Sequence, residues 1–491
     1  MISPQSTTRD LRGDPGYPSL KSHILQMTGL SYYADKDEDL IQRIARRLDE
    51  LTETDCKEYL DLLRDSARGD AELDHLIEQL TVGETSFFRH AELFDGLRAR
   101  VLPDILARNR KCRRLRIWSA GCSIGAEAYS IAILLAREFH REVEGWDVSI
   151  LGTDINRHFL ARASQGIFRK WDFRGVPQSK IEDCFEQRGD ESIIRSEYRR
   201  CVSFQYHNLV RHTFPSLINN LVAFDLILCR NVLIYFNREL IERLVSQFHK
   251  CLVDGGWLLV GHAEPNIELF RAFQSVNVPG AVLYQRHDSA AQRPSHATSS
   301  SPPAVIPTIR ATESIAPLGA VAKAAATPSE PTTLRNGYRH TLWPLLPTPR
   351  GSSSQQRPSI DRHEKLLRIA DRGDLESAME GYVALVAEEP MNAMLHFYIA
   401  LIAEQLGDHR NAETSLRRTV YLDPSNALAH YYSGLLWQKK GLRSQADRAY
   451  RTVLDLLSNK PEDDLIPDAD GLTVVELNEL TRMQLEVMRN S

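Results

Sequence analysis

The stretch Ile117-Trp-Ser-Ala-Gly-Cys-Ser-Ile-Gly-Ala-Glu127 decides the fold of this chain, together with Gly152-Thr-Asp154 at the end of the next apolar run. Residues 115–120 predict a buried strand, the two glycines predict a tight turn, and the apolar residues after them predict a helix. An acidic residue at the end of the second strand is suited to bind the two hydroxyl groups of a ribose. The pattern therefore predicts a nucleotide-type pocket, although a glycine turn that serves only packing has the same sequence.

Strand and helix patterns alternate from this stretch onward, which predicts an α/β, Rossmann-like domain with a parallel sheet covered on both faces. The expected strands cover residues 115–120, 147–153, 202–206, 224–229, 256–261 and 281–285. The alternation breaks between residues 166 and 201, where turn residues cluster. We expect an inserted subdomain there.

Two segments of different character flank this domain. From about residue 19 to residue 81, apolar residues recur at helical spacing, which predicts a small all-α domain. Residues 288–360 are rich in Ser, Pro, Ala and Thr and have little apolar periodicity. That composition predicts a disordered linker.

A repeat of 34 residues follows the linker, because Gly373, Gly407 and Gly441 are evenly spaced and alanines at 378, 412 and 446 keep the same period. This period predicts tetratricopeptide (TPR) helical hairpins, which stack to bury faces that none can bury alone. A capping box at Thr473–Glu476 predicts a final helix that covers the end of the stack. The expected domains are 1–90 (helical), 91–287 (Rossmann-like, with the subdomain inserted at 166–201), 288–360 (linker), 361–460 (three TPR repeats) and 461–491 (tail with the capping helix).

Composition narrows the class of protein. A formal net charge of −5 over 491 residues gives no electrostatic footprint for nucleic acid. The seven cysteines are odd in number and form no CxxC pair, which argues against a disulfide framework and against a zinc site. No apolar run approaches the roughly 20 residues of a membrane span, and the start of the chain has no signal-peptide pattern. We expect a cytoplasmic protein without membrane insertion and without a metal.

Two further motifs give the site a family resemblance. Leu80-Thr-Val-Gly-Glu-Thr-Ser-Phe-Phe-Arg89 precedes the glycine turn, and Phe224-Asp-Leu-Ile-Leu-Cys-Arg-Asn-Val-Leu-Ile-Tyr-Phe236 follows it. Their order resembles the CheR-type chemotaxis receptor methyltransferases, up to about residue 285. The resemblance implies S-adenosylmethionine as methyl donor, S-adenosylhomocysteine as product, and glutamate side chains of a chemoreceptor as acceptors. It also implies that the insertion at 166–201 is a β-subdomain, a small antiparallel sheet.

The resemblance also implies roles for residues near the glycine turn. Asp154 matches the family's ribose contact, Glu127 matches its acidic contact to the donor, and Asn208-Leu209 matches the pair beside the adenine. Each has a structural alternative. Asp154 could be a helix N-cap, and Asn208 could be an ordinary polar turn residue. Glu127 could be present simply because the helix dipole favours a negative charge in the first turn.

The flanking motifs supply the remaining expected contacts. By resemblance, Thr85, Arg89 and the pair Arg230-Asn231 contact the donor, and Tyr235 lines the methyl-transfer site beside Arg89. The family often has an asparagine where Gly83 stands, so only a backbone contact is expected there. The alternatives are that Arg230-Asn231 are ordinary hydrophilic loop residues, and that Tyr235 is a buried tyrosine whose hydroxyl is hydrogen-bonded to the backbone.

The acceptor is inferred from chemistry that the motifs lack. A glutamate has a reference pKa of about 4.3, so it is already an anionic nucleophile at neutral pH and needs no general base. Arg89 could orient such a carboxylate. The Asn/Asp-Pro-Pro-Tyr loop of enzymes that methylate amide or base nitrogens is absent where Arg230–Tyr235 stands. A protein-glutamate O-methyltransferase is therefore the favoured function; the alternatives are a methyltransferase for a small molecule and a non-catalytic TPR scaffold.

Partner contacts are expected at both ends of the chain. Arg43, Arg46 and Arg47 fall on one predicted helix, and in the family a basic helix here docks on the receptor coiled coil. A solvated face paired with neighbouring acids is the alternative. The insertion has a shorter loop than relatives that tether to a receptor's C-terminal pentapeptide, so we expect no tether. The TPR region is expected to bind a peptide or protein partner, or to mediate regulation.

Overall fold

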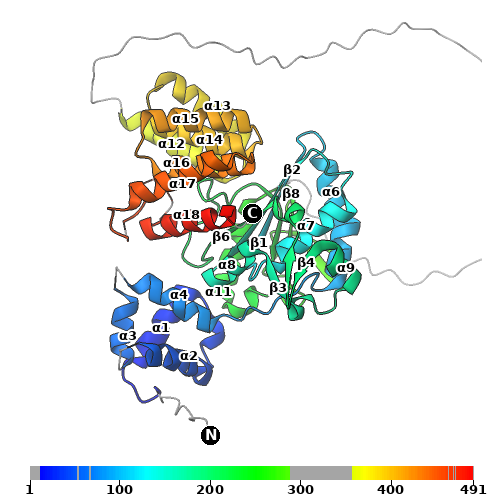
Figure 1. Ribbon diagram of the computed structural model, residues 1–491, viewed down its shortest axis with the longest axis vertical. Coiled ribbons are helices and arrows are strands. Elements are labelled where there is room, and N and C mark those ends of the chain that lie inside the picture. The colour runs from blue at the N-terminus through cyan, green and yellow to red at the C-terminus, as the bar shows by residue number, and fades with distance from the viewer. Residues whose placement is uncertain are drawn as a thin grey trace, which may run out of the picture. The chain divides into compact units, whose positions relative to one another are not determined.

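The computed structural model describes residues 11–51, 55–65, 68–287, 356–462, 464–467, 469 and 471–489. Nearly all of the expected linker lies outside the described residues, and helix α12 begins at Gln356, within the range predicted for the linker. An all-α region, a central α/β region and a series of C-terminal helices follow one another along the chain (Figure 1). The fold class expected from the sequence is confirmed.

The N-terminal region is built from helices around one apolar core. They are α1 (Tyr17–Thr28), α2 (Asp37–Glu50), α3 (Cys56–Leu63) and α4 (Gly69–Leu80), with a 3-10 turn η1 (Ser31–Tyr33). Helix α2 begins with three acidic residues, which favour the positive end of a helix dipole, and it buries Leu40, Ile44 and Leu48. The α3 N-cap is Asp55, whose carboxylate accepts hydrogen bonds from two backbone N–H groups of the first turn.

The central sheet has the strand order β6-β2-β1-β7-β8-β10-β9. Its strands are β1 (Arg114–Ala120), β2 (Asp147–Asp154), β6 (Val202–Tyr206), β7 (Phe224–Cys229), β8 (Leu252–Val260), β9 (Gln274–Val278) and β10 (Ala281–Gln285). Neighbouring strands from β6 to β8 are parallel, and β10 is antiparallel to both β8 and β9. The chain order reverses between β1 and β7, and open α/β sheets bind ligands at such a switch point.

Alternating residues of the strands bury both faces of the sheet. Ile117 packs on the face covered by α5 (Ala91–Gly96), η2 (Leu97–Val101), α6 (Leu102–Arg108), α7 (Ala126–Glu138) and α8 (Arg157–Gln165). Trp118 packs on the opposite face, where α11 (Arg238–Cys251) contributes Phe248. A strand buried on both faces is expected to be mostly apolar, as β7 is apart from Asp225, whereas β1 also buries the polar residues Arg116 and Ser119.

The segment between α8 and β6 forms a second, antiparallel sheet of order β3-β5-β4. It comprises β3 (Ile167–Arg169), η3 (Lys170–Phe173), α9 (Gln178–Cys184), β4 (Phe185–Arg188), β5 (Glu191–Ile194) and α10 (Ser196–Arg199). Phe87 inserts among its aromatic rings, with centroid distances of 4.8 Å to Phe168, 5.1 Å to Phe173 and 5.0 Å to Phe185. The ring cluster therefore fastens this small sheet to the segment that precedes α5.

The C-terminal region consists of helical hairpins. The helices are α12 (Gln356–Asp371), α13 (Leu375–Glu388), α14 (Ala393–Gln405), α15 (His409–Leu422), α16 (Ala427–Lys439) and α17 (Arg443–Leu457), followed by α18 (Val474–Arg489). Gly373, Gly407 and Gly441 lie in the turn inside each hairpin with φ of 85°, 77° and 74°. The hairpins recur at the sequence period, which confirms the expected TPR-like repeats. None of the described helices is long and apolar enough to cross a membrane.

Candidate functional site

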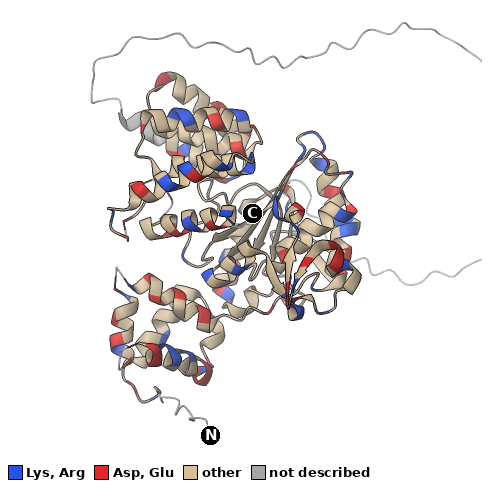
Figure 2. Cartoon of the chain, in the orientation of Figure 1, with Lys and Arg blue, Asp and Glu red and all other residues tan. Residues whose placement is uncertain are grey.

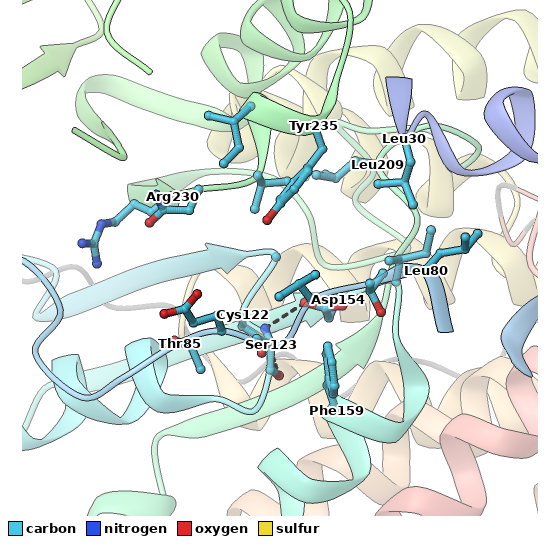
Figure 3. A pocket seen from close by; sticks show the side chains of 18 of the residues that line it. Leu30, Leu80, Thr85, Cys122, Ser123, Asp154, Phe159, Leu209, Arg230 and Tyr235 are labelled. Atoms are coloured by element: carbon cyan, nitrogen blue, oxygen red, sulfur yellow. Dashed lines mark hydrogen bonds between the residues drawn. The ribbon is translucent and has the colours of Figure 1, made fainter. Parts of the chain in front are cut away.

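A cavity of about 630 Å³ lies at the carboxyl ends of β1, β2 and β7 and is closed on another side by α1, η1 and α2. Apolar side chains such as Leu30, Leu209 and Phe159 form part of its wall, and Figure 3 shows Tyr235 reaching into it on the side opposite Asp154. The expected site residues that line it are Arg43, Thr85, Arg89, Glu127, Asp154, Asn208, Leu209, Arg230, Asn231 and Tyr235. Gly83, Arg46 and Arg47 are not among the lining residues.

The carboxylate of Asp154 is fixed by the backbone. Its Oδ2 accepts a hydrogen bond from the Ser123 N–H at 2.8 Å, and its Oδ1 accepts one from the Asn156 N–H at 2.8 Å (Figure 3 draws the first). The N-cap of α8 is Asn156, whose side chain accepts from the Phe159 N–H, so Asp154 is not the helix cap. Burial raises the pKa of Asp154 to about 6, against the lowering effect of these backbone hydrogen bonds.

The glycine turn brings α7 against β2 and β6. Gly125 has φ of 83° and precedes Ala126, and a Cβ on it would lie 2.8 Å from the ring of Phe204. Glu127 lies in the first turn of α7, where its Oε1 accepts a hydrogen bond from Ser119 Oγ at 2.7 Å. A negative charge is favoured there by the helix dipole as well. The position of Glu127 is therefore compatible both with a contact to the donor and with a charge placed there for the helix dipole.

Arg230 joins β7 to this acidic residue. Its Nη1 donates to Glu127 Oε2 at 2.9 Å, and its Nη2 donates to the Arg89 carbonyl at 2.7 Å and lies 2.8 Å from His90 Nδ1. Burial, and next the charge of Arg230, lower the pKa of His90 to about 4. A neutral His90 can accept from Arg230, so the guanidinium is held by three groups at once.

Asn208 differs from the expected reader of adenine. Its side chain is fully buried, its Oδ1 accepts from the Val210 N–H at 2.9 Å, and its Nδ2 donates to the Met27 carbonyl at 3.0 Å. These bonds tie the turn after β6 to the end of α1. Leu209 lines the cavity and offers an apolar surface to a ring.

The segment before α5 contributes Thr85 and Arg89 to the cavity. Arg89 Nη1 donates to the Glu84 carbonyl at 2.8 Å, and the Thr85 carbonyl accepts from Arg174 of the small sheet at 3.0 Å. Gly83 lies behind this wall: a Cβ added to it would be 2.5 Å from the ring of Phe159. The ring of Phe159 therefore takes the space that a side chain at position 83 needs.

The loop after β7 carries Asn231 and Tyr235, and a residue that sequence reasoning missed holds it. The buried carboxylate of Glu264 accepts hydrogen bonds from four backbone N–H groups, those of Asn231, Val232, Ile234 and Gly261. Asn231 has φ of 60°, in the left-handed region, so the loop needs such an anchor. Burial raises the pKa of the Tyr235 hydroxyl, and nearby Arg89 opposes that rise.

Comparisons with known proteins agree with this geometry. The family model described as "CheR methyltransferase, SAM binding domain" matches residues 83–281, and "CheR methyltransferase, all-alpha domain" matches residues 15–81. "Chemotaxis protein methyltransferase 2" of Vibrio cholerae is 33% identical over 252 residues, which are 51% of this chain and 85% of that protein. The chain belongs to the CheR methyltransferase family.

Two further relatives show how far the similarity extends. The "Chemotaxis protein methyltransferase" of Escherichia coli is 31% identical over 276 residues, 55% of this chain and 91% of that protein. "Probable biofilm formation methyltransferase WspC" of Pseudomonas aeruginosa is 28% identical over 391 residues, 78% of this chain and 86% of that protein. This CheR-family chain is a methyltransferase with a domain that binds S-adenosylmethionine.

The residues of the cavity fit that donor. The donor is a nucleoside with a cationic sulfonium and an amino acid moiety, and the cavity combines the two carboxylates Asp154 and Glu127 with apolar walls. Its volume lies within the range of small-molecule sites. Among the described residues no cluster of three or more His, Cys, Asp or Glu side chains could hold a metal ion.

The basic residues of α2 do not form the expected docking face as a set. Arg47 is 8% exposed, and its guanidinium is paired with both oxygens of Glu72 at 2.9 and 2.7 Å. Glu72 in turn accepts from the Tyr59 hydroxyl at 2.6 Å. Arg47 is therefore a structural residue of the helical core, which corrects its assignment as a docking residue.

Arg43 and Arg46 have different surroundings. Arg43 lines the cavity and donates to the Gln79 carbonyl, whereas Arg46 is exposed. Figure 2 shows acidic and basic residues interspersed on the N-terminal helices. Of the three arginines, Arg46 presents its charge to solvent, and Arg43 lies at the boundary between α2 and the cavity.

Proposed function

We propose that this CheR-family enzyme methylates glutamate side chains of a chemoreceptor-type coiled coil and forms glutamate methyl esters. The main support is that residues suited to the donor and residues suited to the acceptor line the same cavity. Glu127 and Asp154 offer carboxylates to a cationic donor, and the segment with Arg89 and the loop with Tyr235 face the same space. An arginine beside the donor site suits an acceptor that is itself an anion.

The chemistry requires little from the protein beyond positioning. When bound, S-adenosylmethionine supplies a methyl group on a sulfonium; a carboxylate oxygen bonds to that carbon as the C–S bond breaks, and sulfur keeps the electron pair. Glu127 and Asp154 would hold the amino acid and ribose parts, and Arg89 would orient the acceptor carboxylate. No proton moves, because a glutamate with a pKa of about 4.3 is ionised at neutral pH.

The walls of the cavity favour such a reaction. Attack of a carboxylate on a sulfonium neutralises two opposite charges, so a site with little water stabilises the transition state relative to the separated ions. Leu30, Leu209 and Phe159 provide the apolar wall. The neighbouring charges are already paired, since Glu127 bonds to Arg230, and so they need not reorganise during the reaction.

The repeats and the pathway are part of the same proposal. The TPR region would bind a protein partner that places the enzyme at its receptor. Similarity to WspC spans 78% of this chain. This supports a receptor whose output is biofilm formation, with motility as the other candidate output.

Methylation of receptor fragments tests the proposal. Full-length protein with donor labelled in the methyl group should label cytoplasmic fragments of receptors from the same genome, and mild base should release the label as methanol, as expected for an ester. Replacing the labelled glutamates by alanine should remove the signal. Label that resists base, or label on a small molecule alone, would overturn the glutamate assignment.

An active-site variant separates chemistry from donor binding. R89A should lose at least about a hundredfold in turnover if the guanidinium orients the acceptor, because misplaced reactants lose much of the advantage of proximity. Binding of S-adenosylhomocysteine should change far less. Full activity of R89A would remove Arg89 from the mechanism.

A further inference from the structure

Helix α18 is part of the hydrophobic core of the repeats. Its residues Val474, Leu477 and Leu480 are buried in the same cluster as the apolar residues of α13 to α17. Its start is fixed by the expected capping box, in which Glu476 Oε2 accepts from the Thr473 N–H at 2.9 Å and the Glu476 N–H donates to Thr473 Oγ1 at 3.3 Å. The capping box therefore determines where this helix begins, and the core of the repeats determines which face it buries.

Two acidic side chains of α18 also contact the methyltransferase domain, which belongs to the same compact unit as the repeats. Glu476 Oε1 lies 3.4 Å from His212 Nε2, and Glu479 Oε2 lies 2.5 Å from Arg157 Nη1. Glu476 is the less exposed of the two acids. Ion pairs shielded from water are weakened less by solvent and salt than exposed ones.

His212 carries the first of these contacts to the cavity wall. Its ring Nδ1 accepts a hydrogen bond from the Asn208 backbone N–H at 3.3 Å, and the backbone N–H of His212 donates to the Asn208 carbonyl at 2.9 Å. An imidazole that accepts at Nδ1 has its proton on Nε2, the atom that faces Glu476. Glu476 thus favours the tautomer that closes the 208–212 turn, and Asn208 and Leu209 of this turn line the cavity.

Arg157 carries the second contact. It is the first residue of α8, its Nε donates to Asp74 of α4 at 2.6 Å, and its guanidinium lies 3.7 Å from the ring centroid of Tyr206. Glu479 completes this set of partners. Because Phe159, two residues along α8, lines the cavity, a shift at the start of α8 changes the shape of the site.

The repeats are held to the methyltransferase domain at a second place. Leu217 and Ile218, from the turn between β6 and β7, are buried in the core of the repeats, and the Leu217 N–H donates to Asp371 Oδ1 at 2.9 Å. Lys439 of α16 pairs with Asp147 at the start of β2 at 2.8 Å. The contacts of α18 are therefore one part of a larger interface.

We propose that Glu476 and Glu479 are positioning residues of the methyl-donor site, through which the repeat region sets the affinity for the donor. They touch no part of the cavity themselves; they hold the 208–212 turn and the start of α8, which do. A protein partner that draws α18 away from these contacts would weaken donor binding and slow methylation. The inference rests on donor binding alone and is independent of the proposed glutamate acceptor.

The test uses the full chain and S-adenosylhomocysteine as the probe. Calorimetry on the E476Q/E479Q variant should show a dissociation constant about three- to tenfold higher than that of the wild type, the size expected when two partly exposed ion pairs are lost. Steady-state kinetics should show a higher KM for the donor with kcat at saturating donor nearly unchanged. The matched control is E486Q, an exposed position on the same helix, which should bind like the wild type.

A double-mutant cycle distinguishes positioning from a general loss of stability. If Glu476 acts through His212, then E476Q should weaken binding in the wild type and have little further effect in an H212Q background. Equal losses in both backgrounds would overturn the route through His212. Donor affinity of E476Q/E479Q within twofold of that of E486Q would overturn the proposal altogether.

Discussion

Glu264 and Asn231 lie just beyond the ends of the adjacent strands β8 and β7, and Glu264 Oε2 accepts a hydrogen bond from the Asn231 N–H at 3.0 Å. The same carboxylate accepts from three other N–H groups. One buried side chain therefore sets the path of the loop that leads to Tyr235.

We expect E264Q to lower activity strongly. An amide in place of the carboxylate presents N–H groups to backbone N–H groups, and leaving buried donors unpaired costs about 1 to 3 kcal/mol. Turnover should fall by a larger factor than the loss of thermal stability alone would explain, because the loop carries residues of the site. The control is E268Q, an exposed glutamate paired with Arg238, and an E264Q variant as active as E268Q would contradict the anchoring role.

Donor binding should depend on pH through Asp154. Its pKa in the protein is about 6 because of burial, so the carboxyl is ionised above that pH and protonated below it. The ionised form is the better acceptor for ribose hydroxyls, so affinity for S-adenosylhomocysteine should fall about tenfold between about pH 7.5 and about pH 5. Calorimetry across this range checks the prediction.

The matched variant for this pH series is D154N. It should bind more weakly at neutral pH and should lack the step near pH 6, since an amide does not titrate. A step of the same size in D154N would assign the pH dependence to another group.

Arg47 should prove structural and Arg46 should not. R47M leaves Glu72 buried with the Tyr59 hydroxyl and no cation, and breaking a buried ion pair in this way costs roughly 3 to 5 kcal/mol. Thermal denaturation should therefore show a large loss for R47M and almost none for R46E. If Arg46 contacts the receptor, R46E should reduce receptor methylation with unchanged donor affinity; full methylation by R46E would exclude it from docking.

Gly83 should tolerate no side chain while Phe159 is present. G83N places a Cβ 2.5 Å from the Phe159 ring, so the ring must move within the cavity wall. Overpacking of this kind costs about 1 to 3 kcal/mol, and we expect donor affinity to fall about tenfold. In an F159A background, G83N should lower donor affinity less than it does in the wild type, because the clashing ring is gone. Wild-type affinity in G83N would show that the wall can adapt.

Much of the sheet could be predicted because its central strands are buried on both faces. The expected strands 115–120, 147–153 and 224–229 match the central strands β1, β2 and β7 to within one residue at each end, and the expected strands 202–206 and 281–285 coincide with β6 and β10. Strand β9 was missed because its residues, Gln274–Val278, lie at the edge of the sheet, are mostly polar or partly exposed, and lack the apolar run of a buried strand. Strand β8 begins at Leu252, whereas the predicted strand began at residue 256. The prediction began late because Asp254-Gly-Gly256 has the composition of a turn.

The site was predictable to the extent that it follows strand ends. Asp154 is the last residue of the buried strand β2, Arg230-Asn231 come directly after β7, and the cavity brings them together. Glu264 follows β8 in the same way, and this position was the signal that could have found it. The occupied amide of Asn208 had no such signal, because its partner Met27 lies far away in the sequence.

The sequence by itself determined the order of secondary structure, the family and the repeat period, because periodicity, glycine turns and short motifs are local properties of the chain. The tertiary structure decided which charges are free to act. Arg47 and Arg46 are adjacent on one helix, yet Glu72, from α4, takes Arg47 into the core and leaves Arg46 exposed. Contacts between residues distant in sequence also brought α18 to His212 and Arg157, because burial and ion pairing depend on neighbours in space.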